Sequence, residues 1–135
     1  MTVLVDTSVW SLALRRSRGP VPAEAVALAA LVRAGRVAVI GPVRQELLSG
    51  VKSGEQFQAL QERLRQFPDT RLDTADFELA AQFFNQCRGR GVQGSNTDFL
   101  ICAVAFRRQH SVFTTDRDFT AFAKVLPVAL HAPGA

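Results

Sequence analysis

Near its N-terminus the chain reads Val3-Leu4-Val5-Asp6-Thr7-Ser8-Val9-Trp10. Residues 2–5 form a short, uninterrupted run of β-branched and apolar side chains, which predicts a strand that is buried on both faces. The hydroxyl of Thr7 or Ser8 can cap a helix that starts at once and continues through Leu14. A buried strand that leads directly into a helix is typical of a parallel sheet covered by helices.

The same alternation of strand and helix continues through the rest of the chain. Further strands are predicted at residues 37–40, 70–72, 111–114 and 127–130. Helices are predicted at residues 23–34, 41–48, 54–67, 74–88, 95–109 and 118–124. There is no internal repeat and no linker, and 135 residues is the length of one domain. We therefore expect one domain over residues 1–135, of the α/β class: a single-domain α/β/α sandwich with a central parallel sheet.

Most of the basic residues are arginine rather than lysine. The net charge is +4, and Lys52 and Lys124 are the only lysines among the sixteen basic residues. A guanidinium group pairs with two phosphate oxygens at once, which favours a nucleic-acid partner. A G+C-rich genome would produce the same bias, so charge alone leaves both explanations open. With 47% hydrophobic and 21% charged residues, the composition is that of a folded globule rather than a disordered chain.

No segment of the sequence is suited to membrane insertion or export. The longest apolar runs, 25–32 and 99–106, are far shorter than the roughly 20 residues of a membrane helix. The N-terminus has neither a basic leader nor a cleavage site. Cys87 and Cys102 are the only cysteines, and their spacing suits neither a disulfide framework nor a redox motif. We therefore expect a cytoplasmic protein with reduced cysteines and no membrane partner.

Four acidic residues stand apart from the others by their position. Asp6 closes the first predicted strand, and Asp116 follows the strand at 111–114. Glu46 and Asp98 each lie one turn inside a predicted helix. In an open parallel sheet, ligands bind outside the carboxyl ends of the strands. We therefore expect these acids at one edge of the sheet, where a bound cation would offset their mutual repulsion.

The residue types favour a hard cation. Carboxylate oxygens without histidine are the ligands of Mg²⁺ or Mn²⁺, and neither His110 nor His131 lies beside a candidate acid, so zinc is not expected. Each acid also has a purely structural interpretation. The alternatives are a helix cap for Asp6, a solvated pairing with Arg44 or Lys52 for Glu46, a capping box with Ser95 for Asp98, and a turn for Asp116.

Three motifs together resemble the PIN-domain ribonucleases, and more narrowly the VapC toxins of bacterial type II toxin–antitoxin systems. They are the N-terminal stretch quoted above, Gly94-Ser95-Asn96-Thr97-Asp98-Phe99-Leu100-Ile101, and Thr114-Thr115-Asp116-Arg117-Asp118-Phe119, with Glu46 between the first two. The resemblance extends from Thr2 to about Leu130, and no acidic position departs from the pattern. It implies a PIN-like fold and a metal-dependent endoribonuclease that cleaves RNA. The target RNA and the cut site have no signature in the sequence.

The resemblance also implies roles for particular residues. Asp6, Asp98 and Asp116 would ligate Mg²⁺ or Mn²⁺ as catalytic residues. Glu46 would hold the ion partly through water, and Asp118 would help a second metal or support the first. The other implied residues are hydroxyl groups that orient ligands or substrate (Thr7, Ser8 and Thr115) and arginines that contact the RNA backbone (Arg15, Arg16, Arg88 and Arg90).

The resemblance implies protein partners as well. Proteins of this kind are homodimers that are inhibited by a small antitoxin whose tail lies across the toxin. We therefore expect a VapB-like antitoxin and a second copy of the chain as partners. Amphipathic helices could supply the groove for the antitoxin, around residues Leu47, Leu48, Val51, Phe57 and Leu60. The plainer role of these apolar side chains is to pack in the core, as such stripes normally do.

Two other functions fit part of the sequence. A Mg²⁺-binding receiver domain also gathers acids at one sheet edge, but it would place a lysine where this chain reads Thr114-Thr115-Asp116. A non-catalytic nucleic-acid-binding module would use the arginines alone. It leaves the acids unexplained, because carboxylates repel phosphate unless a metal intervenes.

Overall fold

Three parallel strands form the centre of the protein, in a computed structural model that describes residues 1–15 and 19–133. The middle strand is β1 (Val3–Val5), with β2 (Val37–Ala38) on one side and β3 (Ser111–Phe113) on the other. Both pairings are parallel, as predicted. All three residues of β1 are fully buried, which explains why this run contains no polar side chain.

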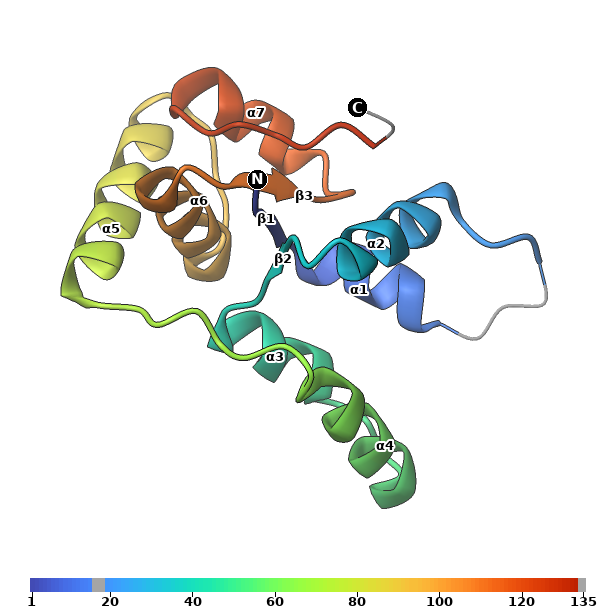
Figure 1. Ribbon diagram of the computed structural model, residues 1–135. Helices are drawn as coiled ribbons and strands as arrows, with labels where there is room; N and C mark the ends of the chain where they lie inside the picture. Colours follow the sequence, from blue (N-terminus) through green and yellow to red (C-terminus); the bar gives the residue numbers. More distant parts are fainter. Residues whose placement is uncertain (16–18, 134–135) are drawn as a thin grey trace.

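Seven helices surround the strands in the described part of the chain (Figure 1). They are α1 (Thr7–Leu14), α2 (Ala23–Arg33), α3 (Gly41–Leu48), α4 (Gly54–Leu64), α5 (Thr74–Gly89), α6 (Asn96–Arg108) and α7 (Asp118–Val125). Helices α1 and α2 lie to one side of the strands, and α5 and α6 lie to the other. The predicted α/β/α sandwich is confirmed. Within the described ranges, no helix is long and apolar enough to cross a membrane.

Helix α6 is the most deeply enclosed helix. Its seven consecutive residues Phe99–Ala105 are all buried, and α5 packs along it. Seven residues make about two turns, so protein surrounds this part of α6 on every side. The buried helix therefore gives the residues at its N-terminus, among them Asp98, a fixed support.

Two predicted strands are not formed. The chain touches the sheet near residues 70–72 and 127–130 only at isolated bridges, Val39 with Asp69 and Val112 with Leu130. Both segments lie at the edges of the sheet beside a proline, which lacks the N–H group that continued pairing requires. The strand β2 ends at Ala38 and the helix α4 ends at Leu64, both earlier than predicted.

Two helix caps also differ from the prediction. The N-cap of α1 is Asp6, rather than Thr7 or Ser8, and its side chain makes no capping hydrogen bond. The N-cap of α5 is Asp73, one residue before the predicted start. Ser95 caps α6 as predicted. The Asp6 carboxylate instead accepts hydrogen bonds from the hydroxyl groups of Ser8, in α1 itself, and of Thr114, which follows β3.

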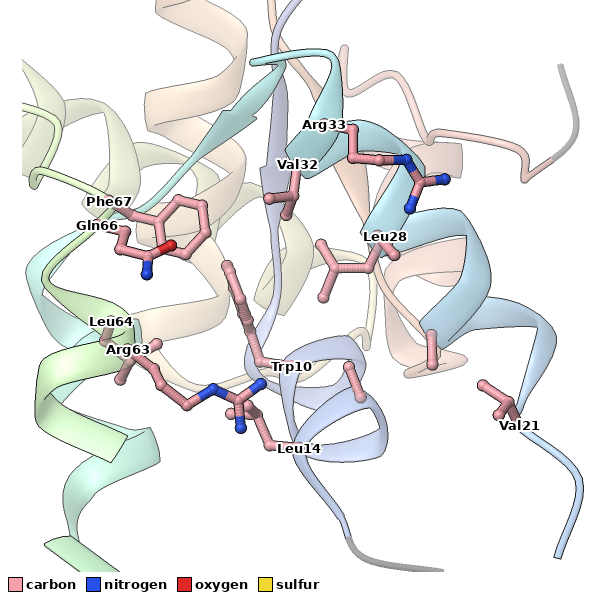
Figure 2. A pocket seen from close by; sticks show the side chains of 13 residues that line it. Trp10, Leu14, Val21, Leu28, Val32, Arg33, Arg63, Leu64, Gln66 and Phe67 are labelled. Atoms are coloured by element: carbon pink, nitrogen blue, oxygen red, sulfur yellow. The ribbon is translucent and has the colours of Figure 1, made fainter. Parts of the chain in front are cut away.

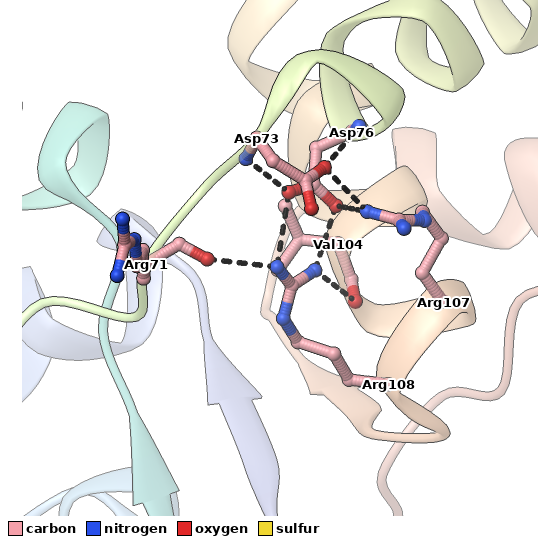
Figure 3. A network of polar contacts seen from close by, with 6 residues as sticks. All are labelled: Arg71, Asp73, Asp76, Val104, Arg107 and Arg108. Carbon is pink, nitrogen blue, oxygen red and sulfur yellow. Dashed lines mark hydrogen bonds and ion pairs between the residues drawn. The ribbon is translucent and has the colours of Figure 1, made fainter.

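A buried ion-pair network fixes the far end of α6 (Figure 3). Asp76 of α5 is fully buried, and its carboxylate accepts hydrogen bonds from Arg107 at 2.8 Å and from both Nη atoms of Arg108 at 2.7 and 2.9 Å. The backbone N–H of Asp73 donates a fourth hydrogen bond, at 2.9 Å. The hydrogen bonds from Arg108 are the main reason why the pKa of Asp76 lies well below its ordinary value. The network therefore ties the start of α5 to the end of α6.

Gly94 lies where a side chain would collide with buried aromatic rings. A Cβ atom at this position would lie 2.5 Å from Cζ of Phe122 and 3.1 Å from Cε2 of Phe99. Phe122 is fully buried, so its ring cannot move aside without a cost. We expect Gly94→Ala to lower the free energy of unfolding by about 1–3 kcal/mol, measured by urea titration. Gly54→Ala, which meets no atom within 4 Å, should show no such loss. Equal stability of the two variants would contradict the collision.

Candidate active site

Asp6 directly follows β1 and is buried, with 7% of the residue exposed. One oxygen, Oδ2, accepts hydrogen bonds from Ser8 Oγ at 2.8 Å and from Thr114 Oγ1 at 2.8 Å. The other oxygen, Oδ1, has no hydrogen bond from any residue that the structure describes. The carboxylate is thus held through one oxygen and keeps the other available.

Thr114 is a site residue that the sequence analysis missed. Val5 of β1 pairs with Phe113 of β3, so the next residues along the two parallel strands, Asp6 and Thr114, meet at the same edge of the sheet. Thr114 Oγ1 also accepts a hydrogen bond from the backbone N–H of Asp116 at 3.0 Å. The signal that would have found Thr114 is its place directly after a strand that is parallel to β1.

Asp98 combines a structural and an electrostatic role. It forms the capping box of α6: the Ser95 N–H donates to Asp98 Oδ2 at 3.0 Å, and the Asp98 N–H donates to Ser95 Oγ at 3.1 Å. Burial raises the pKa of the Asp98 carboxyl, and the charges of Asp6 and Asp116 raise it further. The structural interpretation of Asp98 is therefore correct, and the carboxylate still lies in the electric field of two other acids.

Asp116 lies between β3 and α7, and Asp118 begins α7. The backbone N–H of Asp118 donates to Asp116 Oδ1 at 2.9 Å, so the turn considered for this segment is formed. Asp118 is the exposed first residue of α7. Among residues 1–15 and 19–133, no basic side chain forms an ion pair with Asp6, Asp98 or Asp116. Their charges are therefore not neutralised by the described part of the protein.

Glu46 is exposed on α3 and is joined to α1 by one hydrogen bond, from Thr7 Oγ1 to Glu46 Oε2 at 2.8 Å. The pairing with Arg44 or Lys52 considered from the sequence is not formed. Arg44 instead forms an ion pair with Asp69 at 2.8 Å and binds carbonyl groups at the end of α4. The hydrogen bond from Thr7, the residue after Asp6, therefore holds Glu46 near the site.

The motifs that surround these acids recur in known proteins. The PIN domain family matches residues 3–125. Ribonuclease VapC11 of Mycobacterium tuberculosis is 31% identical over 126 residues, which cover 91% of this chain and 92% of that protein. The chain belongs to the VapC family of PIN-domain proteins. The family that the sequence motifs suggested is confirmed.

Solved structures share the fold of this VapC-family chain. VapBC2 from Rickettsia felis, bound to a DNA fragment from its promoter, has a TM-score of 0.76 at 17% identity, with 97% of this chain and 98% of the other covered. FitAcB from Neisseria gonorrhoeae has a TM-score of 0.74 at 23% identity, with 98% of each chain covered. At these identities the likeness shows the fold alone.

The arginines singled out in the sequence lie in different places. Arg88 is in the last turn of α5 and Arg90 is its C-cap, and both are exposed at the start of the loop that leads to Ser95. Arg15 is the exposed C-cap of α1. Arg16 lies outside the described residues. Thr115 is exposed, and its backbone N–H, rather than its hydroxyl, donates to Ser8 Oγ at 3.0 Å.

The acids of this VapC-family site suit a divalent cation by their chemistry. They offer oxygen atoms only, and Asp98 is partly desolvated beside two like charges. Within the described residues, no three His, Cys, Asp or Glu side chains converge into a group that could hold a metal ion. The donor atoms and the charge therefore fit Mg²⁺ or Mn²⁺, although the side chains are not gathered into a complete ligand set.

Proposed function

We propose that this VapC-family protein is the toxin of a type II toxin–antitoxin module: a homodimeric endoribonuclease that requires Mg²⁺ or Mn²⁺ and acts in the cytoplasm. The main support is electrostatic. The charges of Asp6 and Asp116 reach Asp98, and no basic side chain of the described chain pairs with any of the three. A hard divalent cation is the partner that suits such a set of carboxylates. The relatives named ribonucleases support the class of reaction.

The residues have separate roles in this proposal. A bound Mg²⁺ or Mn²⁺ lowers the pKa of a water molecule and neutralises charge on the scissile phosphate. Ser8 and Thr114 hold Oδ2 of Asp6, so that Oδ1 is the oxygen offered to the ion. Thr7 holds Glu46 beside the site. The ion would be held by Asp6, Asp98 and Asp116, with Glu46 acting partly through water and Asp118 in support.

Cleavage of labelled RNA with and without Mn²⁺ tests this function. We expect purified protein to cut RNA in Mn²⁺ and to stop when a chelator is added. Total bacterial RNA is the substrate, because it contains tRNA, rRNA and mRNA together. Binding of RNA without any cleavage in Mn²⁺ would instead favour a non-catalytic nucleic-acid-binding module.

A groove suited to an antitoxin lies between α1, α2 and α4 (Figure 2). Its volume is about 460 Å³, and arginines Arg33 and Arg63 lie among apolar side chains. An amphipathic helix would place its apolar face in such a groove, with acidic residues toward the arginines. We propose that the antitoxin tail binds there. The apolar lining includes Trp10, Leu14, Leu28, Val32, Leu64 and Phe67.

This groove is a different place from the one predicted from the sequence. None of the five residues named there lines it, because Leu64 at the end of α4 and Phe67 just after it are the residues that face α1. The five line smaller hollows or pack against the core instead: Val51 and Leu60 in one hollow, Leu48 and Phe57 in another, and Leu47 against the core.

Mn²⁺ should raise the melting temperature at pH 7. The ion binds the folded site and not the dispersed acids of the unfolded chain, which adds about 2.7 kcal/mol at 100 times Kd. The raised pKa of Asp98 means that its charged form costs stability at neutral pH, and that this cost shrinks as the pH falls toward the folded pKa. The Mn²⁺ effect should therefore be smaller at pH 5 than at pH 7. Identical melting curves in chelator and in excess Mn²⁺ would contradict a cation site.

A further inference from the structure

A second hollow lies beside the N-terminus of α6. Its volume is about 260 Å³, below the range of about 300–1,000 Å³ typical of pockets for drug-sized ligands. It is also too small for a helix, whose diameter with side chains is about 10 Å. Its size suits one planar ring system. The lining residues are Phe84, Arg88, Val92, Gln93, Gly94 and Phe99.

The hollow lies beside the capping box of α6 that contains Asp98. Gly94 lines it, and the next residue, Ser95, donates its N–H to the Asp98 carboxylate at 3.0 Å. Phe99, which follows Asp98 in α6, lines the hollow as well. A group in the hollow would therefore lie within a few residues of the carboxylate that is proposed to hold the metal ion.

The side chains in the hollow offer the contacts that recognise a base. Phe84 packs edge-on against Phe99, with 5.4 Å between the ring centroids, and remains partly exposed. Arg88 and Gln93 are exposed, and their side chains have no hydrogen-bond or ion-pair partner among the residues that the structure describes. Unstacked RNA bases are bound by aromatic rings and guanidinium planes and by hydrogen bonds to their edges. A carboxamide such as that of Gln93 both donates and accepts such bonds.

We propose that this hollow binds one nucleobase of single-stranded RNA, next to the phosphate that is cleaved, and so helps to select the cut site. In this proposal Phe84 contacts the plane of the base, and Gln93 forms hydrogen bonds to the edge of the base. Arg88 binds either the phosphate of the same nucleotide or the plane of the base. The proposal rests on the proposed ribonuclease function for its biological meaning. Binding of a base is nonetheless measurable without cleavage.

The first test is the binding of four fluorescein-labelled RNA pentanucleotides, A₅, C₅, G₅ and U₅, measured by fluorescence anisotropy in chelator. We expect one of them to bind at least about tenfold more tightly than the weakest. Phe84→Ala and Gln93→Ala should remove this preference, and Arg88→Ala should weaken the binding of all four. Gln82→Ala and Arg65→Ala, which alter exposed residues of the same types, should change neither result.

The second test is cleavage of a randomised RNA pool in Mn²⁺, with the ends sequenced. Gln93→Ala should broaden the base preference at one position beside the cut, while Gln82→Ala should retain the wild-type profile. Equal binding of the four pentanucleotides by the wild-type protein, or a preference that survives in both Phe84→Ala and Gln93→Ala, would overturn the base site. A protein that prefers one base but cleaves no RNA would overturn the ribonuclease function and leave the base site standing.

Discussion

Asp98→Asn should reduce the rate of RNA cleavage in Mn²⁺ by at least about 100-fold. Loss of residues that only support metal ligands typically costs 10- to 100-fold in affinity or activity, and a direct ligand should cost at least as much. The substitution removes one negative charge from a group in which the charges of Asp6 and Asp116 already reach Asp98. The measurement is the initial rate on labelled RNA over a range of Mn²⁺ concentrations.

This variant separates an effect on cleavage from a loss of folding, because the asparagine side chain can still form the cap of α6. Its side-chain oxygen can accept the Ser95 N–H that now binds Asp98 Oδ2 at 3.0 Å. The melting temperature in chelator at pH 7 should rise above the wild-type value, because the partly buried charge that costs stability at neutral pH is gone. Glu62→Gln, which removes an exposed acid from α4, is the matched control and should cleave normally. Wild-type cleavage by Asp98→Asn would show that Asp98 only caps α6.

Asp76→Ala should cause the largest loss of stability, about 3 kcal/mol in the free energy of unfolding. Removing one partner of a buried ion pair typically costs about 3–5 kcal/mol. The lower end applies because the side chains of Arg107 and Arg108 are 33% and 23% exposed, so water can solvate them once the carboxylate is gone. A loss of this size lowers the melting temperature by roughly 10 °C in a domain of this length.

The pH dependence identifies the source of this stability. Because the folded pKa of Asp76 is depressed, its contribution is complete above the ordinary value of 3.8 and falls as the pH drops toward the folded value. Wild type and Asp76→Ala should therefore differ most near neutral pH and converge in strong acid. Asp69→Ala breaks the exposed ion pair with Arg44 and should cost only about 0–1 kcal/mol. A similar small loss in both variants would contradict the role of the buried network.

The sequence predicted those parts of the fold that local patterns encode. The strand β1 is an uninterrupted apolar run, β3 contains the buried pair Val112 and Phe113, and the Ser95–Asp98 spacing identified the cap of α6. Residues 127–130 have a comparable apolar character and form only a bridge. Whether an edge segment pairs depends on its neighbour in space, and the local sequence does not contain that information.

The site residues also divide into those that local sequence patterns predicted and those that depend on contacts between distant parts of the chain. The three aspartates were found because each follows a strand or lies in the first turn of a helix, and Glu46 because its helix follows a strand. Thr114 was missed because its importance depends on the register between β1 and β3. The buried Asp76 was missed because it lies in a polar segment, and Arg107 and Arg108, which make its burial possible, are 31 and 32 residues away in the chain. Contacts over such distances leave no local pattern.

The capping box at α6 also limits how this position can change in evolution. Helix starts accept glutamate readily at the position that Asp98 occupies, so stability alone would tolerate the longer acid there. The longer side chain would move its carboxylate by one methylene group, away from the place where Asp6 and Asp116 act on it. Selection for helix stability and selection for catalytic activity therefore both act on the side chain at position 98. A change that improves one of these properties also alters the other.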